Sequence, residues 1–234
     1  MTELEAAMRW RIPACAVLVA MLMWPAAARA QKTQSDRILS SIEVFEQIMQ
    51  SPEHAIPQAF LQKAEAIVVF PGTFKGGLIL GVHRGKGIIS VREPLTGVWS
   101  PPSFMTITGV SVGAQIGFAE TDIVLIVVNR RGIENLLRSK FKIGADAGVA
   151  AGPIGRDAEA STDLQLKAQI LSYSRSRGLF AGATIKGSVV NSDGDANRNF
   201  YGRKLTPQQI VYEGIGSTVE PVPAWNAMLK KYFQ

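Results

Sequence analysis

Glycine-punctuated β-type sequence between residues 66 and 128 constrains the fold more than any other feature of this chain. Short apolar runs alternate with glycines throughout this stretch. Gly109, Gly113 and Gly117 are four residues apart, so a strand would carry all three on one face. A face without side chains suits a closely packed layer or the bends of a small barrel. A helical glycine face is the alternative, but alternating Thr and Val and a cost of about 1 kcal/mol per helical glycine disfavour it.

The predicted strands follow this stretch and a second one nearer the C-terminus. An apolar run at residues 66–70 ends at Pro71 and Gly72, which indicates a buried strand followed by a turn. Gly85 and Lys86 separate two further runs, which predicts a hairpin. The expected strands cover residues 66–70, 77–84, 87–92, 104–118, 122–128, 166–175 and 179–190, the last two joined across Arg177 and Gly178.

Apolar residues at helical spacing predict a helix over residues 35–49. They fall at Ile38, Leu39, Ile42, Phe45, Ile48 and Met49. The polar face of this helix carries Asp36, Glu43 and Glu46 against Arg37, unlike the Lys/Arg-rich face of a membrane-surface helix, so we expect it to pack on the sheet. Shorter helices are expected from Pro57 and at residues 132–140, 207–212 and 223–233.

These elements predict one α+β domain. Its core is a glycine-rich antiparallel sheet or a small barrel, with the N-terminal helix and the short C-terminal helices packed on it.

The first thirty residues have the features of a signal peptide. Arg9 and Arg11 precede an apolar run at residues 12–24, and Ala28 and Ala30 fit a cleavage site of small residues. The run is too short to cross a bilayer core, which needs roughly twenty residues. An uncleaved anchor or a buried helix is the alternative. We therefore expect residues 1–30 to be removed and residues 31–234 to form an exported domain, either periplasmic or associated with the cell envelope.

The motifs that would support catalysis are incomplete. Ser111 lies in a Gly-x-Ser-x-Gly pattern, but β-type sequence continues on both sides instead of turning into a helix. Both histidines, His54 and His83, precede this serine, whereas the base of such a hydrolase follows it. We expect both histidines at the surface. We therefore predict no catalytic residue and no enzyme.

The candidate metal sites are incomplete as well. One cysteine and two histidines exclude a disulfide framework and a multi-cysteine zinc site. The acidic segment at residues 193–197 lacks the glycine and glutamate of a calcium loop. It favours a turn in which Asp193 or Asp195 caps a short helix. No metal ligand and no cofactor are predicted.

Positive charge is the remaining functional signal. The chain has 25 Lys and Arg against 19 Asp and Glu, and its net charge of +6 favours anionic partners. Nucleic acid is not expected, because no basic run is interleaved with aromatic residues. The cations form either an ordinary solvated surface or an anion-binding face for lipid head groups. The candidate residues for that face are Arg130, Arg131, Arg138, Lys140, Lys142, Arg175 and Arg177.

Several segments, taken in order along the chain, resemble the SYLF domain family. They include Ile56-Pro57, the run from Ala66 to Pro71, and Lys75 to Gly81, followed by Trp99-Ser100-Pro101-Pro102-Ser103-Phe104 and Gly113-Ala114-Gln115-Ile116-Gly117. Gly144 to Ala147, Ala151 to Pro153, Tyr173 to Gly182, Asp193 to Asn197 and Tyr201-Gly202 complete the resemblance.

The resemblance implies a lipid-binding module. Eukaryotic members of the family bind phosphoinositides and some bind actin, whereas bacterial members are exported proteins. We therefore predict a non-enzymatic module that binds anionic phospholipid at the cell envelope through a basic surface. The alternative is a structural or protein-interaction module, with no specific lipid ligand and an unknown protein partner.

Overall fold

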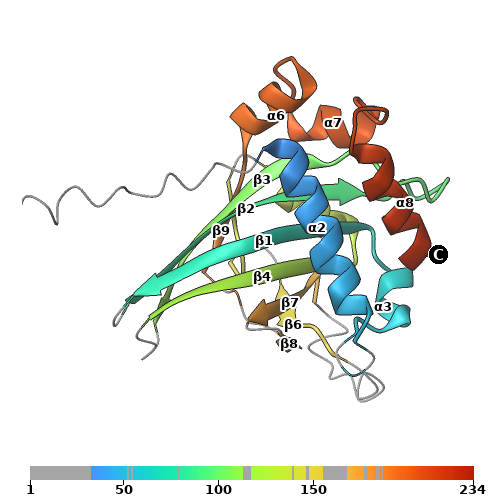
Figure 1. Ribbon diagram of the computed structural model, residues 1–234. Helices are drawn as coiled ribbons and strands as arrows, with labels where there is room; N and C mark the ends of the chain where they lie inside the picture. Colours follow the sequence, from blue (N-terminus) through green and yellow to red (C-terminus); the bar gives the residue numbers. More distant parts are fainter. Residues whose placement is uncertain are drawn as a thin grey trace, which may run out of the picture. The chain divides into compact units, whose positions relative to one another are not determined.

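A nine-stranded sheet organises the structure, a computed structural model in which residues 33–234 form one unit. The strand order is β5-β9-β3-β2-β1-β4-β7-β6, and β8 pairs with β7 (Figure 1). The strands are β1 (Ala66–Gly77), β2 (Leu80–Val91), β3 (Ser103–Val112), β4 (Gly117–Val127), β5 (Phe141–Lys142), β6 (Val149–Ala151), β7 (Ile170–Ser176), β8 (Leu179–Gly182) and β9 (Val189–Ser192). The four long strands β1 to β4 pair in antiparallel fashion with their sheet neighbours.

The structure describes residues 33–51, 53, 55–77, 80–112, 117–138, 140–145, 148–154, 168–176, 179–182, 185 and 187–234. The predicted signal peptide at residues 1–30 lies outside these residues, as do His54, Gly113 and Arg177.

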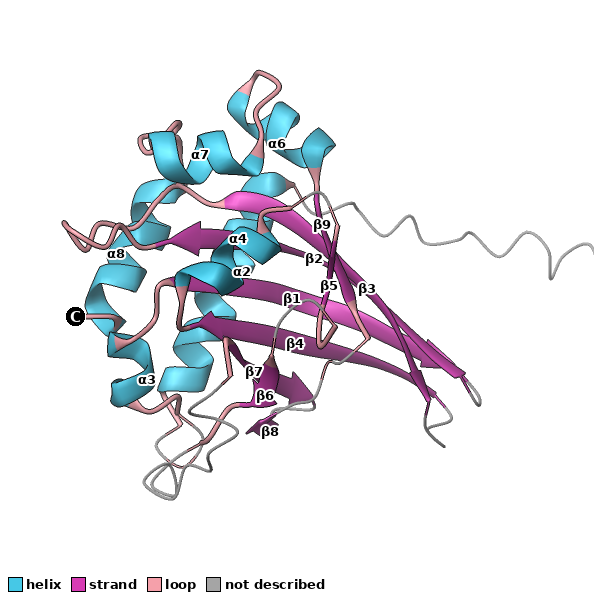
Figure 2. Cartoon of the chain, turned by 180° about the vertical axis from the view of Figure 1, so that it is seen from behind, coloured by secondary structure: helices cyan, strands magenta, loops and turns pink. Residues whose placement is uncertain are grey.

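Helices cover both faces of the sheet. They are α2 (Gln34–Met49), α3 (Gln58–Gln62), α4 (Arg130–Leu136), α6 (Gly194–Tyr201), α7 (Pro207–Glu213) and α8 (Val222–Tyr232). In Figure 1, α2 crosses the near face of the sheet against β1 and β2, and α8 lies beside it. Figure 2 shows the same sheet from behind, with α4 on the opposite face. The predicted α+β class, with an N-terminal helix and short C-terminal helices on the sheet, is confirmed.

The alternation of side chains along the central strands builds two hydrophobic cores. Ile67 and Val69 of β1 face the α2 side, where they share one core with Phe45 of α2 and Trp225 of α8. Val68 and Phe70 face the other side, and their core includes Ile133 and Leu136 of α4 and Val211 of α7. Burying both faces explains why the central strands read as unbroken apolar runs.

Helix α2 is fixed at its start by a capping box. Thr33 accepts a hydrogen bond from the Asp36 N–H, and the Asp36 carboxylate accepts one from the Thr33 N–H. The predicted placement of Arg37 on the polar face is wrong. Arg37 is 4% exposed, and its guanidinium lies 3.0 Å from the Asp193 carboxylate, just before α6. This ion pair ties the first turn of α2 to the C-terminal part of the chain.

Strand β1 does not end at Pro71 and Gly72, as the sequence predicted. It continues to Gly77, and its register with β4 shifts between Phe70 and Thr73. Gly72 takes the positive φ of +59° that this bulge requires, and its N–H donates to the Asp122 carboxylate at 2.8 Å. The turn signal therefore marks a β-bulge within a strand of 12 residues.

The predicted hairpin at Gly85 and Lys86 is also wrong, because β2 runs straight through both residues. Glycine is needed there for close packing. A Cβ on Gly87 would lie 2.1 Å from the Val69 carbonyl oxygen, and one on Gly85 would lie 2.4 Å from the Thr73 hydroxyl. Glycine therefore lets β1 and β2 approach each other across the bulge.

Two other predicted strands are divided differently in the structure. The strand predicted at residues 104–118 is divided between two strands: β3 ends at Val112, and β4 begins at Gly117. The predicted partner of β7, at residues 179–190, is split into β8 and β9. Strand β8 pairs with β7 as expected, but β9 pairs with β3 and β5 instead.

Candidate anion-binding surface

Five of the predicted cations lie on α4 and the segment that leads from it to β5. We call Arg130, Arg131, Arg138, Lys140 and Lys142 the basic strip. Helix α4 starts at Asn129, whose side chain accepts a hydrogen bond from the Gly132 N–H at 2.9 Å. Gly132 is buried against β4, where a Cβ would lie 2.7 Å from a methyl group of Val127. The helix therefore packs tightly on the sheet and gives the cations a rigid base.

Buried apolar residues alternate with exposed cations along this segment. Ile133 and Leu136 of α4 are fully buried. Beyond the helix, Leu137, Phe141 and Ile143 are at most 2% exposed. The five cations of the basic strip are all exposed. Phe141 lies between Lys140 and Lys142 and points into the core, so the two lysines face outward, as alternate residues of an extended segment do.

Helix α7 holds the basic strip in place. The Gln208 side chain donates a hydrogen bond to the Leu137 carbonyl oxygen at 2.7 Å, which satisfies an acceptor at the end of α4. The Arg130 guanidinium lies 5.0 Å from the centre of the Tyr212 ring, a cation–π geometry. Partial burial raises the pKa of the Tyr212 hydroxyl, and Glu134 raises it further, whereas Arg130 acts in the opposite direction. Tyr212 therefore stays neutral beside Arg130 at neutral pH.

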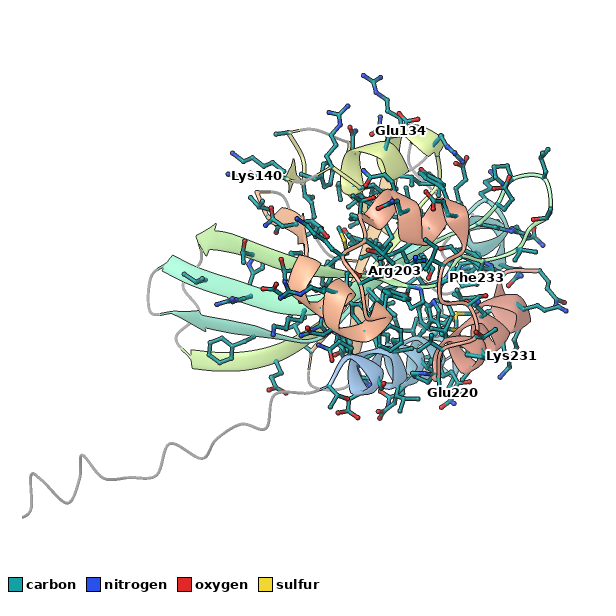
Figure 3. The ribbon with its side chains drawn as sticks, turned by 90° about the horizontal axis from the view of Figure 1, so that it is seen from above. Glu134, Lys140, Arg203, Glu220, Lys231 and Phe233 are labelled. Atoms are coloured by element: carbon teal, nitrogen blue, oxygen red, sulfur yellow. The ribbon has the colours of Figure 1, made fainter. Side chains whose placement is uncertain are left out.

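The net charge of this surface is strongly positive. Between residues 130 and 142 the sequence holds five cations and one acid, Glu134. Figure 3 shows Lys140 and Glu134 extending outward on the same side of the molecule, away from the sheet. The arrangement is suited to contacting several anionic groups at once.

Arg131 and Arg138 are seven residues apart, a spacing that would allow them to share a helix face, but that face does not form. Helix α4 begins at Arg130 and ends at Leu136, so it is shorter than the predicted helix at residues 132–140 and excludes Arg138. The cations are grouped by the burial of the apolar residues between them, not by a helical repeat.

Arg175 does not belong to the basic strip. It follows Tyr173 by two residues on β7, so it faces the α2 side of the sheet, whereas α4 packs on the other side. Its guanidinium makes two contacts with the Asp122 carboxylate, at 2.7 and 2.6 Å. Because that carboxylate also accepts from Gly72, Arg175 supports the bulge in β1. Arg177, the other predicted residue near this turn, is outside the described residues.

The prediction of a surface position for His83 is wrong. His83 is 5% exposed, and its Nε2 lies 2.9 Å from the Ser188 hydroxyl. Ser188 donates in turn to the Ile185 carbonyl oxygen at 2.7 Å. A Cβ on Gly109 would lie 2.4 Å from the His83 ring, so this glycine provides the space for the buried imidazole. The pair links β2 to the turn before β9.

The segment at residues 193–197 caps α6, as predicted. The Asp193 carboxylate accepts from the Ala196 N–H at 3.2 Å. The part that Asn197 plays was not predicted from the sequence. Its side chain accepts from the Phe104 N–H at 2.8 Å and donates to the Phe104 carbonyl oxygen at 3.3 Å, so it pairs with β3 like a strand residue.

The described residues hold neither a cluster of metal-binding side chains nor a helix long and apolar enough to cross a membrane. Ser111 lies within β3, opposite Gly81 of β2. This position differs from the strand-to-helix turn that exposes a hydrolase nucleophile.

Comparisons with known proteins place the chain in a family. The profile described as "Ysc84: Las17-binding protein actin regulator" matches residues 108–232, just over half of the chain. SH3 domain-containing YSC84-like protein 1 of Homo sapiens is 30% identical over 196 residues, which cover 82% of this chain and 56% of that protein. LAS seventeen-binding protein 3 of Saccharomyces cerevisiae is 28% identical over 209 residues, which cover 88% of this chain and 44% of that protein.

These matches define the class as a binding module, and the chain belongs to the Ysc84, or SYLF, family. The predicted resemblance is confirmed. The chain spans about half the length of the curated relatives it matches.

Proposed function

We propose that this protein is a non-enzymatic module that binds anionic phospholipid head groups through the basic strip. The observation that carries the proposal is the alternation along α4 and β5, in which buried apolar residues hold five exposed cations on one side of the sheet. Each cation near an anionic membrane contributes about 1 kcal/mol of attraction. A rigid array needs no ordering on binding, which favours the bound state.

The proposed location of binding is the cell envelope. The apolar run at residues 12–24 and the small residues Ala28 and Ala30 support export and cleavage before Gln31. N-terminal sequencing of material recovered outside the cytoplasm would test this part of the proposal. A recovered chain that still carries the residues before Gln31 would contradict it.

Liposome co-sedimentation tests the lipid proposal. Replacing Arg131, Arg138, Lys140 and Lys142 together by Gln should weaken binding to anionic vesicles by about 4 kcal/mol at most, counting about 1 kcal/mol per cation. Neutral phosphatidylcholine vesicles should bind neither form. Binding of the unchanged protein should fall as salt is raised, because the attraction acts within a Debye length of about 10 Å at 0.1 M salt.

A matched control separates the basic strip from net charge alone. Arg84, Arg198, Lys230 and Lys231 are exposed and lie on β2, α6 and α8. Replacing these four by Gln removes the same charge and should leave most of the binding intact. If both quadruple variants lose binding equally, or if neither loses it, the basic strip is not the site.

A protein-interaction module is the second candidate function. The family description and the name of the yeast relative refer to binding of LAS seventeen and to regulation of actin, which favours protein recognition in those longer relatives. If the protein does not co-sediment with any anionic vesicle tested, this candidate is favoured over lipid binding.

A further inference from the structure

The loop between β2 and β3 holds apolar side chains out in solvent. Leu95 is 94% exposed and Val98 is 64% exposed. We call residues 93–98 the tip loop. Figures 1 and 2 both show the loop that leaves β2 projecting away from the end of the sheet. A lone exposed leucine is ordinary at a protein surface, but two such side chains on a projecting loop form an apolar point.

The tip loop is rigidly built. The Glu93 N–H donates to the Val98 carbonyl oxygen, and the Gly97 N–H donates to the Glu93 carbonyl oxygen, both at 2.8 Å. Gly97 has a φ of +70°, which closes the turn. Beyond the loop, Trp99 is 6% exposed, and its ring packs 4.9 Å from that of Phe233. The base is therefore anchored in the core, while Leu95 is held outside it.

The tip loop lies at the end of the sheet where the basic strip begins. The Glu65 N–H donates to the Val127 carbonyl oxygen at 2.8 Å, and the Glu65 carbonyl oxygen accepts from the Arg92 N–H at 2.7 Å. The ends of β2 and β4 are thus linked through the residue that precedes β1. The tip loop follows the first of these ends, and Arg130 and Arg131 follow the second within a few residues.

Charged side chains surround the base of the tip loop. A groove of about 510 Å³ separates it from the end of α3, and its lining includes Lys63 and Arg92 as well as Glu65 and Glu93. The Arg92 side chain crosses toward α3 and donates to the Gln62 carbonyl oxygen at 3.3 Å. The tip loop is apolar at its end and charged at its base. A bilayer surface has the same order of layers, because the polar head groups cover the apolar acyl chains.

We propose that the tip loop inserts Leu95 and Val98 beneath the head groups of an anionic bilayer when the basic strip binds its surface. The inference rests on the proposed function and extends it from surface attraction to partial insertion. The bilayer is the proposed occupant because the tip loop and the start of the basic strip lie at the same end of the sheet, where Glu65 links the ends of β2 and β4. In this arrangement Lys63 and Arg92, at the base of the tip loop, would meet the lipid phosphates.

An environment-sensitive fluorophore tests the insertion directly. In the full chain with Cys15→Ser, Leu95→Cys is labelled with a nitrobenzoxadiazole probe and mixed with phosphatidylglycerol vesicles. The emission should shift to the blue and intensify as residue 95 enters the acyl region. Val82→Cys is the matched control, because Val82 is 55% exposed on β2, near the end of that strand opposite to the tip loop. Its emission should not change. The probe reports on its own position, whatever other part of the chain contacts the bilayer.

A substitution gives the second measurement. Leu95→Ser should weaken vesicle binding about tenfold, the effect of removing one leucine from an apolar environment. Val82→Ser should have no effect. Circular dichroism should show the same fold in both variants, since each residue is exposed.

The outcomes separate the two proposals. If the quadruple basic-strip variant loses binding while the probe at residue 95 stays in water, insertion is wrong and surface binding stands. Insertion is also wrong if Leu95→Ser binds vesicles like the unchanged protein. The exposed apolar side chains of the tip loop are then better explained by a protein partner. If the unchanged protein binds no anionic vesicle, both proposals are wrong.

Discussion

Arg37 and the cations of the basic strip lie on opposite faces of one sheet and meet opposite environments. Arg37 is 4% exposed, is paired with Asp193 at 3.0 Å and lies 5.1 Å from the centre of the Phe104 ring. The cations of the basic strip are exposed on a segment anchored by buried neighbours such as Phe141. The same kind of side chain therefore holds α2 on one face and is presented to solvent on the other.

Burial affects the charged group of Arg37 but not the exposed cations of the basic strip. Burial lowers the pKa of Arg37, and the hydrogen bond and charge of Asp193 act against this shift. The guanidinium remains charged at neutral pH, so it depends on Asp193 to offset the loss of its water shell. The cations of the basic strip are exposed, so they do not depend on a buried carboxylate in this way. Removing one of them should affect binding without unfolding the protein.

The largest effect on stability is expected at Asp193. Asp193→Ala leaves the Arg37 guanidinium buried without this carboxylate and also removes the cap of α6. Breaking a buried pair in this way should lower the free energy of unfolding by about 3–5 kcal/mol. Urea denaturation at neutral pH measures the change.

Asp195 provides the matched control for that experiment. Its pair with Arg198 is almost the same length, 3.2 Å, but the two side chains are 86% and 59% exposed. Asp195→Ala should be nearly neutral, because exposed pairs contribute little. Equal losses in the two variants would show that burial does not set the strength of the Arg37–Asp193 pair.

An intermediate effect is expected at Arg175. Arg175→Gln removes the contacts with Asp122 in a half-buried site next to the bulge in β1. A hydrogen bond to a charged group contributes about 1.5–3 kcal/mol, so a loss of about 1.5 kcal/mol is expected in urea denaturation. Binding to anionic vesicles should not change, since Arg175 faces away from the basic strip. Weaker vesicle binding by a folded Arg175→Gln variant would restore this residue to the lipid site.

The sequence predicted best the elements that depend on local signals. Helical spacing identified α2, short helices were expected where α7 and α8 lie, and the acidic segment before α6 predicted its cap. These signals lie within a few turns of the helix concerned, so a single sequence carries them. The cations of the basic strip were found for the same reason, because they cluster within thirteen residues.

The errors arose where a residue's environment is set by distant parts of the chain. Glycine occurs both in turns and where backbones approach closely, and the sequence does not separate the two. Gly87 permits close packing against Val69, which lies on another strand. His83 is buried by its contact with Ser188, and Arg175 is separated from the basic strip by the sheet itself. Such placements follow from the strand order, which local sequence patterns do not specify.

The smallest effect on stability is expected in the basic strip itself. Replacing Arg131, Arg138, Lys140 and Lys142 by Gln alters exposed side chains, and each such change usually shifts stability by less than about 0.5 kcal/mol. The difference in stability between the variant and the unchanged protein should depend on the salt concentration. Like charges close together repel each other in the folded state, so at low salt the variant should be as stable as the unchanged protein or slightly more stable. At 1 M salt, where the Debye length is about 3 Å, this difference should vanish. Urea denaturation at both salt concentrations measures it. A large loss of stability would show that these cations support the fold as Arg37 does, and the contrast between the two faces of the sheet would then be wrong.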